Sequence, residues 1–210
     1  MIFLNSDPLT LLAVALALVI GITCHEFSHA LVADLLGDHR PRAMGRLSLN
    51  PVRHIDPMGA IFFLVAGFGW GRPVMVNAGA MRGGRQSMAW VSAAGAIANV
   101  VVAVLVAIVL RVALLVLSPG SDIPYVLIII VFLNVMLALF NLLPIPPLDG
   151  YNFALSFLPF QQALQVQRWA QYGLLVLLLL LVLGRTMPGG GPLGWLQDLA
   201  QLITVVLTGA

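Results

Sequence analysis

The stretch TCHEFSHALVADLLGD, residues 23–38, ends a long apolar run and holds two histidines and the only glutamate of the chain. The chain has 210 residues, of which 60% are hydrophobic and 9% charged, and its mean hydropathy is +1.03. A soluble domain of this size cannot bury so much apolar surface. The composition therefore predicts an α-helical polytopic membrane protein, in which buried ionisable groups mark a functional site by default.

A helix that crosses a hydrocarbon core about 30 Å thick needs roughly 20 apolar residues. We expect about five to six transmembrane helices in one membrane-embedded domain over 1–210, with a catalytic core over about 8–150 and additional C-terminal helices over about 151–210. No basic region precedes the first apolar run, so we expect it to be a retained helix and not a signal peptide. The candidate spans are Pro8–Leu36, Met88–Leu117, Pro124–Leu142 and Trp169–Leu183, with Pro192–Leu207 as a weaker candidate.

The longest polar interval, residues 37–87, carries seven of the ten arginines, and the chain has no lysine. By the positive-inside rule, this interval faces the cytoplasm. In two short segments of this interval, Arg42–Leu49 and Arg72–Asn77, polar and apolar residues partly alternate, and glycine or proline bounds each segment. Both segments are therefore predicted as β-strands. The apolar segment Met58–Phe68 is too short to cross a bilayer, so we expect a re-entrant or half helix.

The opening stretch contains His25-Glu26-Phe27-Ser28-His29, an H-E-x-x-H pattern. On a helix, residues four apart share a face, so both imidazoles can bind one zinc ion while Glu26 lies beside it. The alternative is that these residues only hydrogen-bond within a helical bundle. A catalytic zinc site usually has three protein ligands, and the residues that could supply the third are Asp149, His54, Asp56, Asp34 and Cys24.

Asp149 is the second-to-last residue of the stretch NLLPIPPLDG, residues 141–150, which follows a predicted span. Together with H-E-x-x-H, this stretch resembles the site-2 protease family of intramembrane zinc metalloproteases. The resemblance extends through MGRLSLNPVRHIDPMG (44–59), FGWGRPVMVN (68–77) and AGAIAN (94–99), in the order found in that family. It implies one zinc ion held by His25, His29 and Asp149, with Glu26 as the catalytic acid/base.

The resemblance also implies roles for other polar residues. Asn99 would face the site and stabilise the oxyanion, although a helix–helix hydrogen bond is the alternative, and His54 would support a site group or be a polar loop residue. Ala96 replaces a proline common in the family, and Arg72 stands where lysine is usual. We expect no PDZ or CBS domain within these 210 residues. The residues expected to bind substrate are Arg72, Val74, Val76, Asn77 and Asn141.

The expected substrate is a membrane protein with a transmembrane helix, cut in or near that helix during regulated intramembrane proteolysis. The expected location is the cell membrane, plasma or inner, with a multi-pass topology and the active site toward the cytoplasm. We expect a lipid bilayer but no nucleic acid as a partner, and the sequence leaves the oligomeric state open. A zinc transporter and a catalytically silent membrane adaptor remain the alternative functions. The chain has few intramembrane acids for a transporter, and Glu26 beside the ligands disfavours an adaptor.

The expected depths of His25 and Asp149 in the membrane provide a check on whether both can bind the same ion. At about 1.5 Å per residue, His25 lies roughly 25 Å along a helix that begins at Pro8. Asp149 reaches a similar depth only if helix 124–142 runs in the same direction as the first helix. One crossing by 88–117 satisfies this condition, provided that 58–68 does not cross.

Overall fold

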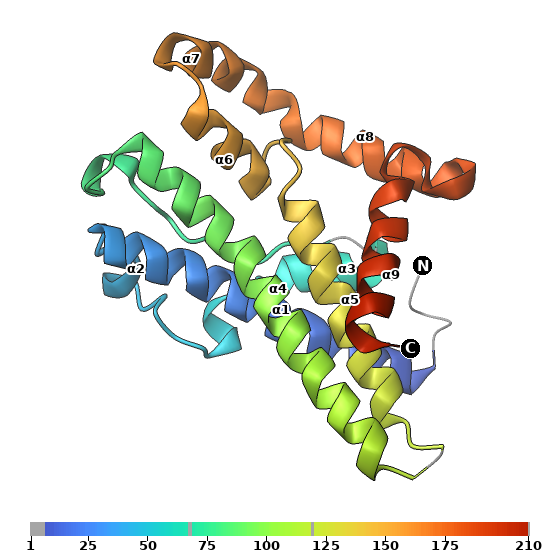
Figure 1. The fold of residues 1–210 in the computed structure, drawn as a ribbon. Helices are drawn as coiled ribbons and strands as arrows, with labels where there is room; N and C mark the ends of the chain where they lie inside the picture. Colours follow the sequence, from blue (N-terminus) through green and yellow to red (C-terminus); the bar gives the residue numbers. More distant parts are fainter. Residues whose placement is uncertain (1–6, 67–68, 119, 210) are drawn as a thin grey trace.

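The computed structural model describes residues 7–66, 69–118 and 120–209, and for residues 62–66 it describes the backbone alone. These residues form nine α-helices and four short 3-10 helices (Figure 1). The long helices are α1 (Pro8–Leu36), α4 (Arg85–Val116) and α5 (Ile123–Asn141). The shorter ones are α2 (Arg40–Ala43), α3 (Pro57–Ala66), α6 (Asp149–Phe157), α7 (Phe160–Trp169), α8 (Gly173–Thr186) and α9 (Gly194–Thr208), with η1 (Pro51–Arg53), η2 (Ala78–Ala80), η3 (Ala170–Tyr172) and η4 (Pro188–Leu193).

Residues at both ends of α1 fix its length. The Asp7 carboxylate accepts a hydrogen bond from the Thr10 backbone N–H at 2.9 Å, and Pro8 occupies the first turn, where its missing N–H costs nothing. At the other end, Gly37 adopts a φ of 115°, a left-handed conformation that closes the helix. The predicted helix Pro8–Leu36 is therefore confirmed.

Small side chains every four residues on α1 and α4 allow these helices to pack closely. Such rows let the backbones of neighbouring helices approach, which drives packing where water is absent. His25 and His29 continue the row on α1, so the same face both packs the bundle and carries the predicted site. The buried row on α1 is Ala13, Ala17, Gly21, His25, His29 and Ala33, and the row on α4 is Gly95, Asn99, Ala103 and Ala107.

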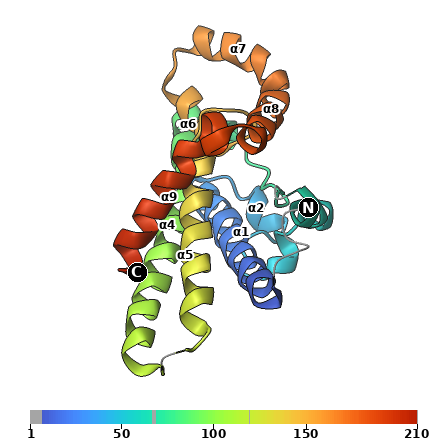
Figure 2. The same cartoon turned by 90° about the vertical axis from the view of Figure 1, so that its right-hand side faces the viewer.

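Helix α9 lies along α4 and α5, and α6 packs against α4, while α7 and α8 lie beyond one end of this bundle (Figure 2). Residues Ala103 and Ala107 of α4, Val131 and Val135 of α5, and Ala200 of α9 form an apolar core. Four helical stretches in the described residues are long and apolar enough to span a membrane: Pro8–Leu36, Arg85–Val116, Ile123–Asn141 and Phe160–Thr186. They match the four predicted spans. The predicted total of five to six is not confirmed, because α9 has only 15 residues.

Helix α3 matches the predicted re-entrant segment in part. Its ten residues are about 15 Å long, half of what a bilayer requires. The end of the predicted segment, residues 67–68, lies outside the described residues. Helices α1 and α5 run in the same direction, and α4, which lies between them in the sequence, runs in the opposite direction (Figure 1). The depth of Asp149 requires this arrangement.

The two predicted strands are not formed in the described part of the chain. Residues 40–43 are helical, and Gly45 has a φ of 69°, which bends the chain away from an extended course. Arg72–Asn77 has no partner strand, and one antiparallel bridge between Ile55 and Gly71 is the sole β-type pairing found in the described ranges. A strand needs a neighbour for its N–H and C=O groups. This prediction was therefore wrong.

The segment 72–77 instead bonds to other parts of the chain. The Arg72 N–H donates to the His54 carbonyl at 2.7 Å, and the Asn77 N–H donates to the Asp38 carboxylate at 2.6 Å. Asp38 is fully buried and also accepts two hydrogen bonds from the Arg40 guanidinium, each at 2.8 Å. It thus ties the end of α1 to this segment.

The Asp38–Arg40 contact makes stability depend on pH. The Arg40 guanidinium beside Asp38 lowers the pKa of that carboxyl to about 2, from 3.8 in the unfolded chain. Because the folded-state pKa is depressed, the stabilisation is complete above about pH 4 and disappears as the pH falls through about 2. We predict that the native protein unfolds at a higher temperature than Asp38→Asn above pH 4, and that this difference shrinks between pH 4 and 2. Thermal unfolding in detergent micelles measures it, and a difference unchanged down to pH 2 would refute the role of Asp38.

Candidate metal centre and active site

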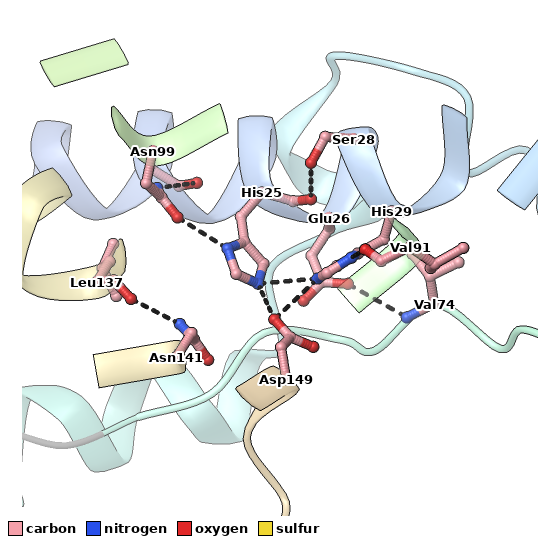
Figure 3. A network of polar contacts seen from close by, with 11 residues as sticks. His25, Glu26, Ser28, His29, Val74, Val91, Asn99, Leu137, Asn141 and Asp149 are labelled. Carbon is pink, nitrogen blue, oxygen red and sulfur yellow. Dashed lines mark hydrogen bonds and ion pairs between the residues drawn. The ribbon is translucent and has the colours of Figure 1, made fainter. Parts of the chain in front are cut away.

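Two histidines of α1 and the first residue of α6 meet at one point (Figure 3). The Asp149 Oδ2 atom lies 2.9 Å from His25 Nε2 and 3.1 Å from His29 Nε2, and the two Nε2 atoms are 3.0 Å apart. Both histidines are buried, and the Asp149 side chain is 22% exposed. Among the described residues, this is the one group of histidine, cysteine and carboxylate side chains arranged to hold a metal ion.

Hydrogen bonds at the opposite ring nitrogens set the tautomer of each histidine. His29 Nδ1 lies 2.7 Å from the Val91 carbonyl oxygen, which can only accept, so Nδ1 carries the proton. His25 Nδ1 lies 2.8 Å from Asn99 Oδ1 and likewise donates. Both Nε2 atoms therefore present lone pairs toward Asp149.

The orientation of Asn99 follows from its other contacts. Its Nδ2 donates to the Gly21 carbonyl at 3.1 Å and to Asn134 Oδ1 at 3.0 Å, so Oδ1 must face His25. The Asn134 Nδ2 donates in turn to the Ile130 carbonyl at 2.9 Å. Asn99 and Asn134 are both fully buried. Both N–H groups of Asn99 are thus engaged in this structure, and the predicted oxyanion bond would need one of them as its donor, so that role stays a prediction.

The three converging atoms fit a zinc ion. Two nitrogen lone pairs and a carboxylate oxygen repel one another at 2.9–3.1 Å unless a cation lies among them. Ligands at the corners of a tetrahedron 2.0–2.1 Å from its centre are about 3.3 Å apart, close to these separations. Two imidazoles and one carboxylate also form a ligand set typical of catalytic zinc sites, which leave one position for water.

Gly95 allows α4 to approach the metal ligands. A Cβ atom at this position would meet His25 Cε1 and would lie 2.6 Å from His29 Nε2. Any side chain here would displace the imidazoles. The glycine of the AGAIAN stretch is therefore a steric requirement of the site.

The other candidates for the third ligand have different partners. Asp34 pairs with Arg42 and His39, and Asp56 accepts a hydrogen bond from the Gly59 backbone N–H. His54 Nε2 donates to the Ser48 carbonyl at 2.6 Å, and Cys24 is half-buried outside the ligand group. Asp149 is the candidate that the structure places with His25 and His29.

Glu26 lies beside the ligands and contacts the segment 72–77. Its Oε2 atom accepts a hydrogen bond from the Val74 backbone N–H at 3.2 Å (Figure 3). A cavity of about 890 Å³ opens next to Glu26 and the three ligands. Apolar side chains line most of it, including Leu18 and Ile22 of α1, Leu133 and Leu137 of α5, and Leu177 and Leu181 of α8.

The residues expected to bind substrate lie in two places. Val74 and Val76 line the cavity, as does Asn141, whose Nδ2 donates to the Leu137 carbonyl at 3.0 Å. Arg72 and Asn77 do not line it. His54 contacts no metal ligand in the structure but supports the loop through Ser48 and Arg72.

The sequence interpretation missed Asn134 and the apolar lining of the cavity. The available signal for Asn134 was an amide within an otherwise apolar span, which lipid disfavours unless the amide has a partner. Asp38 was also missed, and its position just after a helix-ending glycine gave no indication of a contact with residue 77.

Comparisons with known proteins agree with this site. The candidate zinc metalloprotease YwhC of Bacillus subtilis (strain 168) is 39% identical over 183 residues, which cover 83% of each chain. The candidate zinc metalloprotease Rip2 of Mycolicibacterium smegmatis is 32% identical over 186 residues, 83% of this chain and 70% of Rip2. Rip2 of Mycobacterium tuberculosis (strain H37Rv) is 32% identical over 191 residues, 87% of this chain and 71% of that protein. No protein-family model and no solved structure matches the chain.

The ligand set predicts the metal content of variants. The purified protein should hold close to one zinc ion per chain, and His25→Ala, His29→Ala and Asp149→Ala should each lower the occupancy. Gly95→Ala should lower it as well, because its methyl group displaces both imidazoles. Glu26→Gln is the matched control that retains zinc, since Glu26 is not a ligand. Elemental analysis decides this, and full occupancy in Asp149→Ala would exclude Asp149 as the third ligand.

Proposed function

The chain belongs to the site-2 protease family of zinc metalloproteases, and we propose that it cuts membrane proteins in or near a transmembrane helix. This cleavage would serve regulated intramembrane proteolysis. The protein is a zinc-dependent hydrolase, and the proposal concerns which peptide bonds reach its active site.

One observation carries the proposal: the ligands and Glu26 open onto a largely apolar cavity between helices long enough to span a membrane. A soluble peptide would lose hydration on entering such a cavity, whereas a transmembrane segment is already apolar. The cavity includes side chains from α1, α5 and α8, three elements that a bilayer would surround. This arrangement supports a lipid-embedded substrate.

The roles of the residues follow from their contacts. Zinc supplies a Lewis acid that polarises the scissile carbonyl and makes the attacking water more acidic. Glu26, beside the ligands, takes the proton of the water and passes it to the leaving amine. Asn99 acts as a positioning residue, because its Oδ1 holds the proton of His25 on Nδ1 and so keeps Nε2 free for the metal.

The segment 72–77 offers a backbone edge to the substrate. In extended chain, alternate residues direct their N–H and C=O groups to the same side, so Val76 shares the side of Val74, which faces Glu26. The carbonyls of Val74 and Val76 and the Val76 N–H have no hydrogen-bond partner in the described part of the chain. A substrate strand paired here would lie beside Glu26, and its backbone would regain the bonds lost on unwinding.

In this arrangement Glu26 and the substrate compete for one donor. The Val74 N–H that now bonds to the Glu26 carboxylate is the donor that a paired substrate carbonyl would take. Substrate binding would therefore release Glu26 for proton transfer. The segment 72–77 would thus make proton transfer by Glu26 depend on whether substrate occupies the cavity.

We place the active site toward the cytoplasm and the protein in the cell membrane. Seven of the ten arginines lie in the interval 37–87, which follows the helix end that carries the ligands.

Unwinding of the substrate helix predicts which substrates are cut fastest. In lipid, each backbone hydrogen bond broken without replacement costs several kcal/mol, so a transmembrane helix resists attack. Glycine disfavours a helix by about 1 kcal/mol relative to alanine and proline by about 3 kcal/mol. We predict that either residue placed near the cut site speeds cleavage, and that a run of leucines slows it. The measurement is the rate of cleavage of such a substrate series in proteoliposomes, with mass spectrometry of the products.

Glu26→Gln is the matched control, because it retains size and metal but cannot take a proton. It should bind zinc and leave every substrate intact. Equal rates across the series, or cuts confined to loops far from the membrane, would contradict the proposal. If vesicles that contain the protein take up zinc, and Glu26→Gln does not change the rate of uptake, the result would instead favour a transporter.

A further inference from the structure

Three arginines line a second cavity on the loop side of the segment 72–77. Arg46, Arg53 and Arg72 surround a space of about 280 Å³ together with Met44. The three come from different parts of the interval between α1 and α4. No role in metal binding or catalysis accounts for them.

These arginines lack the carboxylate partners that neighbouring arginines have. Arg40 pairs with Asp38 and Arg42 with Asp34, whereas no described carboxylate lies within 4 Å of the guanidinium nitrogens of Arg46, Arg53 or Arg72. Like charges gathered around one cavity repel one another. Burial lowers the pKa of Arg46, and the charge of Arg72 adds to this effect, although the Glu26 carboxylate opposes it. Among the described residues, the cavity therefore holds no carboxylate paired directly with these three guanidinium groups.

Backbone contacts hold two of the guanidinium groups in place. Arg46 donates to the carbonyls of Arg53 and of Arg72, the latter at 3.2 Å, and Arg53 donates to the Gly45 carbonyl at 2.7 Å. The Arg72 guanidinium has no hydrogen-bond partner among the described residues. The cavity is thus formed before any ligand binds, and one of its cations is free to turn toward the ligand.

Exposed apolar side chains lie close in sequence to the three arginines. Val52 is 76% exposed, Met75 65% and Leu49 63%, and each lies within three residues of one of these arginines. Met75 also lines the large cavity beside Glu26. Water disfavours such a cluster, whereas the boundary between lipid headgroups and acyl chains accommodates both apolar and basic side chains. The cytoplasmic leaflet, which this loop faces in the proposed orientation, carries anionic lipids.

We propose that Arg46, Arg53 and Arg72 form a binding site for the phosphate of an anionic phospholipid of the cytoplasmic leaflet. Guanidinium groups bind phosphate through charge-assisted, paired hydrogen bonds. The inference rests on the orientation given in the proposed function. Because Arg46 bonds to the Arg72 carbonyl, a bound headgroup would also steady the segment that bears Val74.

The test measures lipid binding to the full-length Glu26→Gln protein in detergent, so that it does not depend on proteolysis. Native mass spectrometry with phosphatidylglycerol and with phosphatidylcholine gives the two affinities. We expect a preference for phosphatidylglycerol, and a loss of about tenfold in its affinity in Arg72→Gln, because one charge-assisted hydrogen bond to the phosphate is removed. Arg72→Gln removes a charge without removing an internal hydrogen bond, so the fold should persist.

Two further variants sharpen the result. Arg168→Gln, on α7, makes the same change of charge away from the cavity and should bind both lipids as the parent does. Arg53→Lys retains the charge and should retain the preference for phosphatidylglycerol, whereas Arg53→Gln should lose it. Equal binding of the two lipids, or a preference unchanged in Arg72→Gln and Arg53→Gln, would overturn the proposal.

Two other ligands are tested in the same assay. Inorganic phosphate that displaces phosphatidylglycerol at equal concentration would assign the site to free anions and overturn the lipid proposal. An acidic peptide that binds in place of phosphatidylglycerol would assign it to the substrate and also overturn the proposal. Failure of proteolysis with lipid binding intact would contradict the proposed function alone.

Discussion

The hydrogen bonds behind the two histidines are the constraint on which the rest of the structure depends. Asn99 of α4 holds His25 and the Val91 carbonyl of α4 holds His29, so both lone pairs point at Asp149. Asn134 of α5 and the Gly21 carbonyl of α1 occupy both amide protons of Asn99. One buried polar chain thus links α1, α4 and α5. In lipid, where no water replaces a lost partner, this chain fixes both the helix packing and the ligand geometry.

Close packing and the chemical site use the same row of residues. His25 and His29 occupy positions in the four-residue row that otherwise holds alanine and glycine. Gly95 leaves the space into which their rings fit. A side chain at Gly95 would therefore affect helix packing and metal binding together, whereas one at an exposed position of α4 would affect neither.

The sequence predicted correctly those features that depend on residues close to one another in the chain. Helix α1 is bounded by Asp7, Pro8 and Gly37, whose preferences act over one turn, and H-E-x-x-H has its meaning on a single helix. The strand predictions failed because a strand depends on a partner distant in sequence, and Arg72–Asn77 found its partners in His54, Glu26 and Asp38 instead. The contacts of Asn99 could not be predicted, since they depend on which amides of α1 and α5 lie opposite. The position of Asp149 was open from the residues alone and followed from the family resemblance.

The most direct measurement of the central claim is zinc X-ray absorption on the purified protein. The geometry predicts two imidazole nitrogens and one carboxylate oxygen in the first shell, with Asp149→Ala losing one light-atom neighbour while the imidazole signals persist. Glu26→Gln should give the spectrum of the native protein. A sulfur neighbour at about 2.3 Å, or a first shell unchanged in Asp149→Ala, would show that the metal is held by other residues and would contradict the account.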